Sequence, residues 1–479
     1  MPRLPLRVAA SACALLTLQA AVALGAHPAE PSHEVPHVAW GLPFGLLLAA
    51  IAVLPLLGRT HHWWERNRSK LLVGLVLGGL VLAHYATRGH GYHGAEPGAS
   101  SVLAVLHHSV LGDYVPFVTL LFSLYVIAGG LRLTGDLPAR PVINSAILGL
   151  GALLASLIGT TGASMVLIRP LLQTNRERVH VRHTVLFFIF LVSNVGGCLL
   201  PIGDPPLFLG YLQGVPFLWT LNLVGPWAVC VTTILATYYV WDRLAYRRET
   251  PRDLARDESI RVPVRLRGTI NVVWLALAVL SVALIVPGRP LPGTTAIVPD
   301  YAREAVLLIL AGLSLATTPR GLRRELEFNY TPIAEVACLF LGIFVTMQPP
   351  LELLEARGGD LPLSTPASFY WSTGALSSVL DNAPTYLVFL QLAQARQGPA
   401  EGQMVPLSGG RSVPQSLLAA ISLGAVFFGA CTYIGNGPNF MVKAIAERQG
   451  VAMPGFFGYM GYSLVVLLPP FLLVRLIFL

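Results

Sequence analysis

Two acidic side chains lie within long apolar stretches, and each is accompanied by residues that interrupt a helix. Asp204 lies in the stretch IGDPPLF (202–208) and is the only charge in the apolar run 184–241. Asp381 is the only charge in the run 361–395. A carboxylate at the centre of a bilayer costs about 2.5–3.5 kcal/mol on insertion scales. Two such acids at interrupted helices therefore indicate a binding function.

Both interruptions are surrounded by side chains that carry oxygen. A helix that stops and restarts exposes carbonyl groups at one end and N–H groups at the other. Hydroxyl, amide and carboxylate oxygens suit hard cations such as Na⁺. Asp204 and Asp381 are also predicted to carry protons, because an acid in such a site can exchange one. The predicted ion- or substrate-binding residues are Thr160, Thr161, Ser164, Ser193, Asn194, Gly203 and Asp204 in the first half, and Asp381, Asn382, Thr385, Gly435, Asn436 and Asn439 in the second.

Structural explanations of these residues stay open at this stage. Asp204 before Pro205 is a good N-cap for a second half-helix. Asp381 begins an Asp-Asn-x-Pro sequence that is typical of a turn. Ser193 and Asn194 could make polar contacts between helices.

Composition predicts an all-α polytopic membrane protein. Of 479 residues, 54% are hydrophobic and 12% are charged, and apolar runs of about 20 residues recur along the chain. The net charge of +8 comes from Arg residues between these runs, which is the positive-inside pattern and not a nucleic-acid signal. The five Cys have no paired spacing, so neither a disulfide framework nor a bound metal is predicted. Apolar helices are expected near 41–57, 70–86, 114–131, 142–159, 184–201, 216–241, 268–287, 302–318, 332–350, 415–433 and 456–478.

The first 26 residues are expected to form a signal peptide. Two Arg precede an apolar core, and Ala21-Val22-Ala23 fits a small-x-small cleavage site. Residues 27–100 would then hold a periplasmic segment and two transmembrane helices. The segment 87–111 reads equally well as a loop or as an interfacial piece.

Placing the Arg-rich loops inside the cell predicts two re-entrant hairpins. The segment 142–173 would leave and return on the cytoplasmic side, with its tip near Thr160-Thr161. The segment 366–396 would enter from outside, with its tip at Asp381-Asn382. Non-helical backbone at that depth is tolerated where it is buried in protein or lines a wet cavity.

A short internal repeat accompanies the hairpins. The stretch IGDPPLF (202–208) matches IGNGPNF (434–440), so the pattern I-G-[DN]-x-P-x-F recurs. Paired interrupted helices in halves of opposite orientation predict a binding site at the bilayer midplane. The predicted organisation is a first repeat at 101–241 with a broken helix at 184–212, a linking segment at 242–315 with a basic cytoplasmic loop, and a second repeat at 316–479 with a broken helix at 415–447.

The stretches SNVGGCLLPIGDPPLFLG, GTTGASMVLIRPLL, LDNAPTYLVFL and YIGNGPNF resemble the ion transporter superfamily, in particular bacterial D-type sodium/proton antiporters and citrate transporters. The resemblance covers about 100–478. It implies a scaffold domain and a transport domain that moves as an elevator, a homodimer, and the inner membrane of a bacterium. The hairpin tips depart from the Ser-Asn-Thr tips of the dicarboxylate symporters, which weakens the expectation of dicarboxylate transport.

The charges favour a cation as the transported species. No Lys or Arg lies at either break, and two carboxylates would repel a naked tricarboxylate. Sodium/proton antiport is therefore the main prediction, with Na⁺ and H⁺ as transported ions and no resident cofactor. The alternative is symport of citrate, of a metal–citrate complex or of another organic anion, because a bound metal would mask the charge.

Two other classes are weaker. All twelve His lie at or before position 183, which could indicate a His-rich membrane oxidoreductase. His84 and His90 are six residues apart, however, and that is a poor spacing for joint ligation on one helix. The sequence does not exclude a passive channel.

Overall fold

Helices make up nearly all the regular structure of this chain. The computed structural model describes residues 35–259, 262–396 and 403–479, and the predicted signal peptide lies outside them. Five described helices are long and apolar enough to cross a membrane, or six if a helix pair bent by 42° counts as one span, so this is a multi-pass membrane protein. These five are Asn67–Thr87, Ala99–Ala128, Pro141–Ile158, Phe217–Tyr246 and Phe456–Phe478, and the bent pair is Thr331–Thr346 with Gln348–Asp360.

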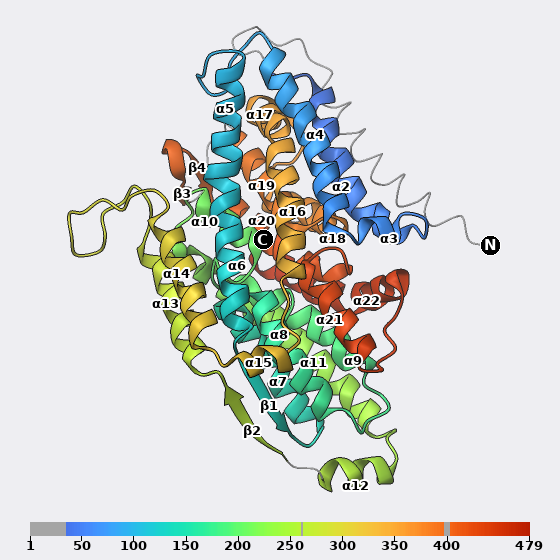
Figure 1. Cartoon of the computed structure of the whole chain (residues 1–479). Helices are drawn as coiled ribbons and strands as arrows, with labels where there is room; N and C mark the ends of the chain where they lie inside the picture. The colour runs from blue at the N-terminus through green and yellow to red at the C-terminus, as the bar shows by residue number, and fades with distance from the viewer. Residues whose placement is uncertain (1–34, 260–261, 397–402) are drawn as a thin grey trace.

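The N-terminal helices α2 and α4 pack against α16 and α17 of the second half of the chain. Figure 1 shows α2 and α4 beside α16 and α17 in the upper part of the molecule, and α6 continuing from there toward the lower part. The helices of this segment are α2 (Leu42–Val53), α3 (His61–Trp64), α4 (Asn67–Thr87), α5 (Ala99–Leu106) and α6 (Val115–Ala128).

The helix expected to begin at 114 begins fifteen residues earlier. A π-helical stretch, His107–Tyr114, joins α5 and α6 into one rod from Ala99 to Ala128. Polar residues and Pro116 suggested a helix start at this point, but the wider π turns let the helix continue while Ser109 and Asp113 are buried.

The first predicted hairpin is observed as two helices joined by a single glycine. Gly159 has φ +78°, a conformation that residues with a side chain rarely adopt. The next helix restarts at Pro205, where the sequence predicts the break, but it stops at Leu191, ten residues before the expected end at 201. The helices are α7 (Pro141–Ile158), α8 (Thr160–Thr174), α9 (Arg182–Leu191), α10 (Pro205–Leu212) and α11 (Val224–Tyr246).

The basic segment expected as a loop contains regular structure. Strands β1 (Arg132–Asp136) and β2 (Val262–Arg267) pair antiparallel and place Arg132 opposite Arg267. Like charges directly opposite each other destabilise a strand pair, and here both Arg side chains form ion pairs with Glu325. The helices of the linking segment are α12 (Pro251–Ser259), α13 (Ile270–Leu284), α14 (Ala302–Thr317) and α15 (Arg320–Glu325).

The second half repeats the arrangement of a hairpin followed by an interrupted helix. Helices α9 and α20 are apolar on all sides, and nearly every residue in them is buried. A helix of this kind lies in the interior, so the broken helices lie at the centre of the molecule. The elements are α16 (Thr331–Thr346), α17 (Gln348–Arg357), α18 (Pro366–Val379), α19 (Asn382–Ala395), β3 (Met404–Pro406), β4 (Ser412–Pro414), α20 (Gln415–Phe428), α21 (Gly437–Arg448) and α22 (Phe456–Phe478).

Close packing of α4 on α16 gives a prediction about stability. A β-carbon on Gly74 would lie 3.1 Å from the Cα of Gly342, whereas one on Gly79 of the same helix would meet nothing within 4 Å. Gly74→Val should therefore destabilise the protein by about 1–3 kcal/mol through overpacking, and Gly79→Val should not. Thermal unfolding in detergent measures the difference, and equal melting temperatures for the two variants would contradict the packing.

Candidate functional site

Four helices begin around the carboxylate of Asp204. Its Oδ1 accepts hydrogen bonds from Thr160 Oγ1 at 3.0 Å and Asn436 Nδ2 at 2.9 Å, and its Oδ2 accepts one from Asn382 Nδ2 at 2.6 Å. Thr160 and Asn382 are the first residues of α8 and α19, while Asp204 and Asn436 immediately precede α10 and α21. Asp204 is only 1% exposed. Both hairpin tips and both helix breaks therefore meet at one buried acid.

Asp204 occupies the N-cap position of α10 without capping it. Pro205 and Pro206 have no N–H to donate, and Leu207 N donates to the backbone carbonyl of Asp204 at 3.1 Å. The carboxylate consequently has no partner in its own helix and points to the other three. The N-cap explanation thus accounts for the backbone position of Asp204 and not for its side chain.

The charge of Asp204 is surrounded by neutral donors and by the positive ends of helices. Each helix N-terminus carries about half an elementary positive charge. Arg169 and Lys443, the basic residues nearest the breaks in sequence, bond elsewhere: Arg169 donates to Leu326 O at 2.5 Å, and Lys443 pairs with Glu447. In the described part of the chain, no Lys or Arg forms an ion pair with Asp204.

Backbone contacts hold the first hairpin tip on the first break. Thr160 N donates to Gly203 O at 2.8 Å, so this predicted ligand carbonyl already accepts a hydrogen bond. A β-carbon on Gly203 would lie 2.3 Å from Gly197 O, and one on Gly435 would lie 2.6 Å from Gly429 O. Each break therefore contains a pair of glycines six residues apart whose backbones touch. Gly435, a predicted site residue, belongs to the second pair.

A directional amide network extends from the acid. Asn439 Nδ2 donates to Gly429 O at 2.8 Å and Thr432 O at 2.9 Å, so Asn439 Oδ1 must accept; it does so from Asn194 Nδ2 at 2.7 Å. Asn194 Oδ1 is then left buried without a hydrogen-bond partner among the described residues, as is Asn382 Oδ1. A buried amide oxygen without a partner is an acceptor that a ligand can use.

One stranded oxygen, Asn194 Oδ1, and the donating Nδ2 of Asn382 both lie close to Gly429. A β-carbon on Gly429 would lie 3.1 Å from Asn194 Oδ1 and 3.4 Å from Asn382 Nδ2. Ser193 and Ser164 lie beside this group, with their hydroxyls 2.8 Å apart, and Ser193 O accepts from Asn436 Nδ2 at 3.1 Å.

Three predicted site residues stay apart from these bonds. The Asp381 carboxylate accepts from Ala383 N at 3.1 Å and so caps its own helix α19, as the turn explanation holds. Thr385 Oγ1 donates to Asp381 O within the same turn. Thr161 is half-buried and has no side-chain hydrogen bond among the described residues. None of these three side chains forms a hydrogen bond with Asp204 among the described residues, although the Asp381 carboxylate lies near enough to repel it.

Two serines escaped the sequence prediction. Ser156 Oγ donates to Gly196 O at 2.5 Å and Ser377 Oγ donates to Ala425 O at 2.7 Å. Each lies on the first helix of its hairpin, close to the tip, and ties that helix to the adjacent broken helix. Both serines lie near the end of the first helix of a hairpin, and this matching position could have identified them from the sequence.

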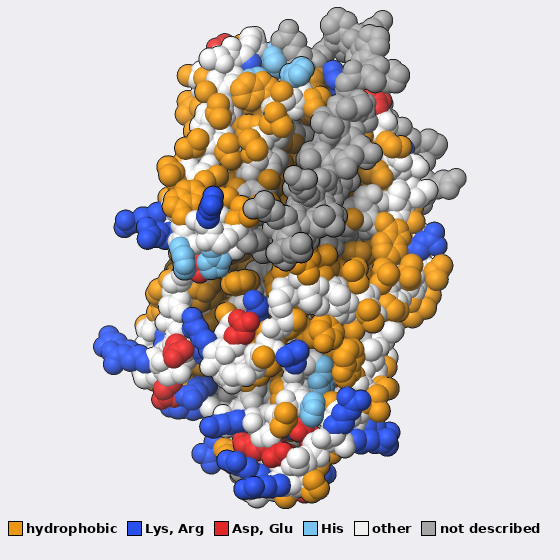
Figure 2. Space-filling view, turned by 90° about the vertical axis from the view of Figure 1, so that its right-hand side faces the viewer, with side chains coloured by type: hydrophobic (Ala, Val, Ile, Leu, Met, Phe, Trp, Pro, Cys, Tyr) orange, Lys and Arg blue, Asp and Glu red, His pale blue; other side chains and the backbone are white. Residues whose placement is uncertain are grey.

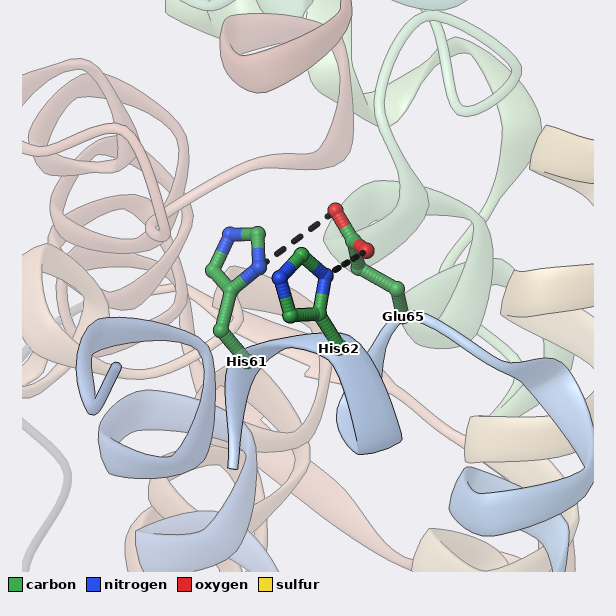
Figure 3. A group of neighbouring side chains, drawn as sticks. All are labelled: His61, His62 and Glu65. Carbon is green, nitrogen blue, oxygen red and sulfur yellow. Dashed lines mark ion pairs between the residues drawn. The ribbon is translucent and has the colours of Figure 1, made fainter. Parts of the chain in front are cut away.

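A group of possible metal ligands lies elsewhere, on the short helix α3. The ligand atoms of His61, His62 and Glu65 lie within 4.8 Å of one another, and both His pair with Glu65 (Figure 3). The side chains are open to solvent, with His62 90% and Glu65 59% exposed. Helix α3 makes its main contacts with α4 and the turn before it, and none of the three side chains bonds to a residue around Asp204.

Comparison with known proteins identifies the class of this chain. A family model described as "Putative citrate transport" matches residues 32–479. The chain belongs to this family. The match supports a membrane transporter that acts on a small substrate, and it gives no support to the oxidoreductase alternative.

Individual relatives are distant. Two proteins, one in Mycobacterium bovis and one in Mycobacterium tuberculosis, are named as uncharacterized transporters. Each is 23% identical to this chain over 361 residues, which are 70% of this chain and 78% of the relative. A solved structure of MtrF from Neisseria gonorrhoeae, described as illuminating a class of antimetabolite efflux pumps, has 14% identity and a TM-score of 0.42; the match covers 85% of this chain and 93% of that one.

Adjacent threonines at the first tip test the bonds to Asp204. Thr160→Val keeps the shape of the side chain but removes one donor from the buried carboxylate, so it should cost about 1–3 kcal/mol of stability. Thr161→Val makes the same change one residue away and should have little effect. Melting temperatures in detergent report the difference; a larger loss for Thr161→Val would show that the bond contributes nothing.

Proposed function

We propose that this protein is a cation-coupled secondary transporter of citrate or of a metal–citrate complex, and that Asp204 lies in its transport site. Family membership supports the substrate class. The observation that carries the site is the meeting of four helix N-termini at one buried carboxylate whose partners are neutral.

Helix ends answer the objection that the breaks lack basic residues. N-termini bind anions through their free N–H groups and their dipoles, without Lys or Arg. The starts of α8, α19 and α21 surround Asp204, so a substrate carboxylate would find a positive environment there. A metal ion bound to citrate would also reduce its repulsion with Asp204.

The stranded oxygens support a coupling cation in the same pocket. Asn194 Oδ1 and Asn382 Oδ1 lack partners among the described residues, and Asp204 adds a negative charge. Carboxylate and amide oxygens are ligands for hard cations, so Na⁺ bound at either amide would satisfy an orphaned acceptor. A proton on Asp204 would serve the same coupling role by neutralising the carboxylate.

Sodium/proton antiport is the second candidate. It is favoured by the absence of any Lys or Arg ion pair to Asp204 in the described part of the chain, since a single titratable acid can carry H⁺ and Na⁺ in turn. Asp381 is the weaker carrier in this scheme, because its carboxylate is engaged as the cap of α19.

The proposal includes inverted repeats and an elevator motion. Helices α8, α18 and α19 have 14–15 residues, about 21–23 Å at 1.5 Å per residue, which is too short for a hydrocarbon core of about 30 Å. Their length supports a re-entrant second hairpin and a re-entrant return arm in the first, whose other arm α7 has 18 residues. The paired glycines of the two breaks support a repeat. The resemblance to known transporters supports a homodimer, and the bacterial relatives support the bacterial inner membrane.

Transport in proteoliposomes tests the function. Labelled citrate, with and without Mg²⁺, is offered under an inward Na⁺ gradient or an inward proton gradient. We expect citrate uptake driven by one of the gradients and reduced at least tenfold in Asp204→Asn, because the neutral side chain can neither bind the cation nor carry the proton.

Asp300→Asn is the matched control, because Asp300 is an exposed acid outside the site. Uptake of citrate that persists in Asp204→Asn would refute the role of Asp204. A pH change driven by Na⁺ alone, without any citrate uptake, would establish the antiport candidate in place of citrate transport.

Two glycines of the second broken helix test cation binding. Gly429→Ala would place a methyl group 3.1 Å from Asn194 Oδ1, whereas a methyl group on Gly437 would meet nothing within 4 Å. Added Na⁺ should raise the melting temperature of the wild type and of Gly437→Ala, and of Gly429→Ala much less. An equal Na⁺-dependent rise in both variants would place the cation elsewhere.

A further inference from the structure

A large cavity lies away from Asp204, where α9, α11 and α22 meet. Its volume is about 900 Å³. It is lined by the segment that leads into α9, by the C-terminal part of α11 and by Tyr462 of α22. Because none of its lining residues contacts the Asp204 carboxylate, the transport site described above does not account for it.

Basic side chains surround one end of this cavity. His180, Arg182 and Arg248 line it, and both Arg are exposed. Arg182 Nε donates to Ala452 O at 2.6 Å, which fixes the side chain and leaves the two terminal nitrogens of its guanidinium outside that bond. Within the described ranges, neither Arg forms an ion pair with an acid.

The acids next to this end are already neutralised from within. Asp242 is bonded to Arg178 at 2.6 Å and to His183 at 2.9 Å. The Glu249 carboxylate accepts from the backbone N–H groups of the chain that leads into α9 and also pairs with Arg178 and His180. Arg178, Arg182 and Arg248 thus stand against the two acids Asp242 and Glu249, so the open end of the cavity keeps a net positive charge.

The rest of the cavity is an apolar wall along a membrane-spanning helix. Val240 and Leu244 of α11 are 59% and 53% exposed and line the cavity together with Leu186 and Trp241. Figure 2 shows His and basic side chains near the lower end of this face, with hydrophobic side chains above them. A cationic end continuous with an apolar groove matches a molecule with an anionic head and a hydrocarbon tail.

We propose that this cavity binds an anionic phospholipid of the cytoplasmic leaflet. The phosphate lies between Arg182 and Arg248, since guanidinium groups bind phosphate oxygens in pairs, and an acyl chain lies along Val240 and Leu244. Basic pockets between transmembrane helices on the cytoplasmic side are known to take such headgroups. The bound lipid would hold α9, which leads to the Asp204 break, against α11 and α22.

Lipid titration of the purified full-length protein tests the site. In detergent, phosphatidylglycerol should raise the melting temperature at a lower concentration than phosphatidylcholine with the same chains. Arg182→Gln/Arg248→Gln should raise the half-saturating concentration of phosphatidylglycerol at least tenfold. Arg243→Gln/Arg247→Gln removes two equally exposed charges from the same segment but none from the cavity, and it should behave as the wild type.

Control measurements separate a loss of lipid binding from a loss of folding. An unchanged melting temperature without lipid shows that the variant folds; should the double variant fail there, Arg248→Gln and Arg248→Lys replace it, and the Lys variant should retain more lipid. Equal effects of the two lipids, equal losses in the control pair, or the same stabilisation by inorganic phosphate would overturn the proposal. Native mass spectrometry gives a further check. The proposal would also be overturned if the double variant kept its bound phosphatidylglycerol but no longer formed a dimer, because the two Arg would then contact a second copy of the chain.

Discussion

The fold depends on one carboxylate that is bonded to three separate parts of the chain. Asp204 joins the first hairpin through Thr160, the second hairpin through Asn382 and the second break through Asn436. Without these bonds, an acid that is 1% exposed would carry an uncompensated charge. The positive ends of four helices make the arrangement tolerable. Both halves of the protein are thereby required to build a single pocket.

A second buried acid shows the contrast. Asp242 is neutralised by Arg178 and His183, which are charged or chargeable groups in direct contact with it. Breaking such a pair would strand a charge in the protein interior, so that cluster is suited to a fixed connection between α11 and the start of α9. Asp204 has only neutral partners, and neutral partners leave room for a proton or a metal cation to supply the missing charge.

Much of the fold was predictable because its signals are local. The Gly and Pro residues around Asp204 and Asn436 marked where the second half-helices begin, and the apolar runs gave most of the helices. The end of the first half-helix at Leu191 was missed, because the apolar run continues beyond it. The rod from Ala99 was missed, because polar residues near Asp113 are typical of a helix start and a π-helical stretch leaves no distinct pattern. The strand Val262–Arg267 was missed because its side chains are exposed on both faces and its partner lies far away in sequence.

The site was predictable in its members but not in its connections. Asn382 and Asn436 were identified from their places at a tip and a break, yet their bonds to Asp204 span 178 and 232 residues. A single sequence gives no pairing across such distances. It also treated Asp204 and Asp381 alike, whereas two prolines deny Asp204 a local partner and Ala383 N provides one for Asp381.

Because of Pro205 and Pro206, the Asp204 carboxylate has hydrogen-bond donors from distant segments of the chain but none from the start of its own helix. A carboxylate beside ordinary residues would settle on the N–H groups of its own helix whenever the other segments withdrew. Asp204 cannot cap its own helix in this way, because the first two residues of α10 are prolines. If the hairpins move apart, Asp204 must be met by water, by a proton or by a metal cation. The two prolines thus raise the free energy of any state in which Asp204 has lost its partners from the other segments.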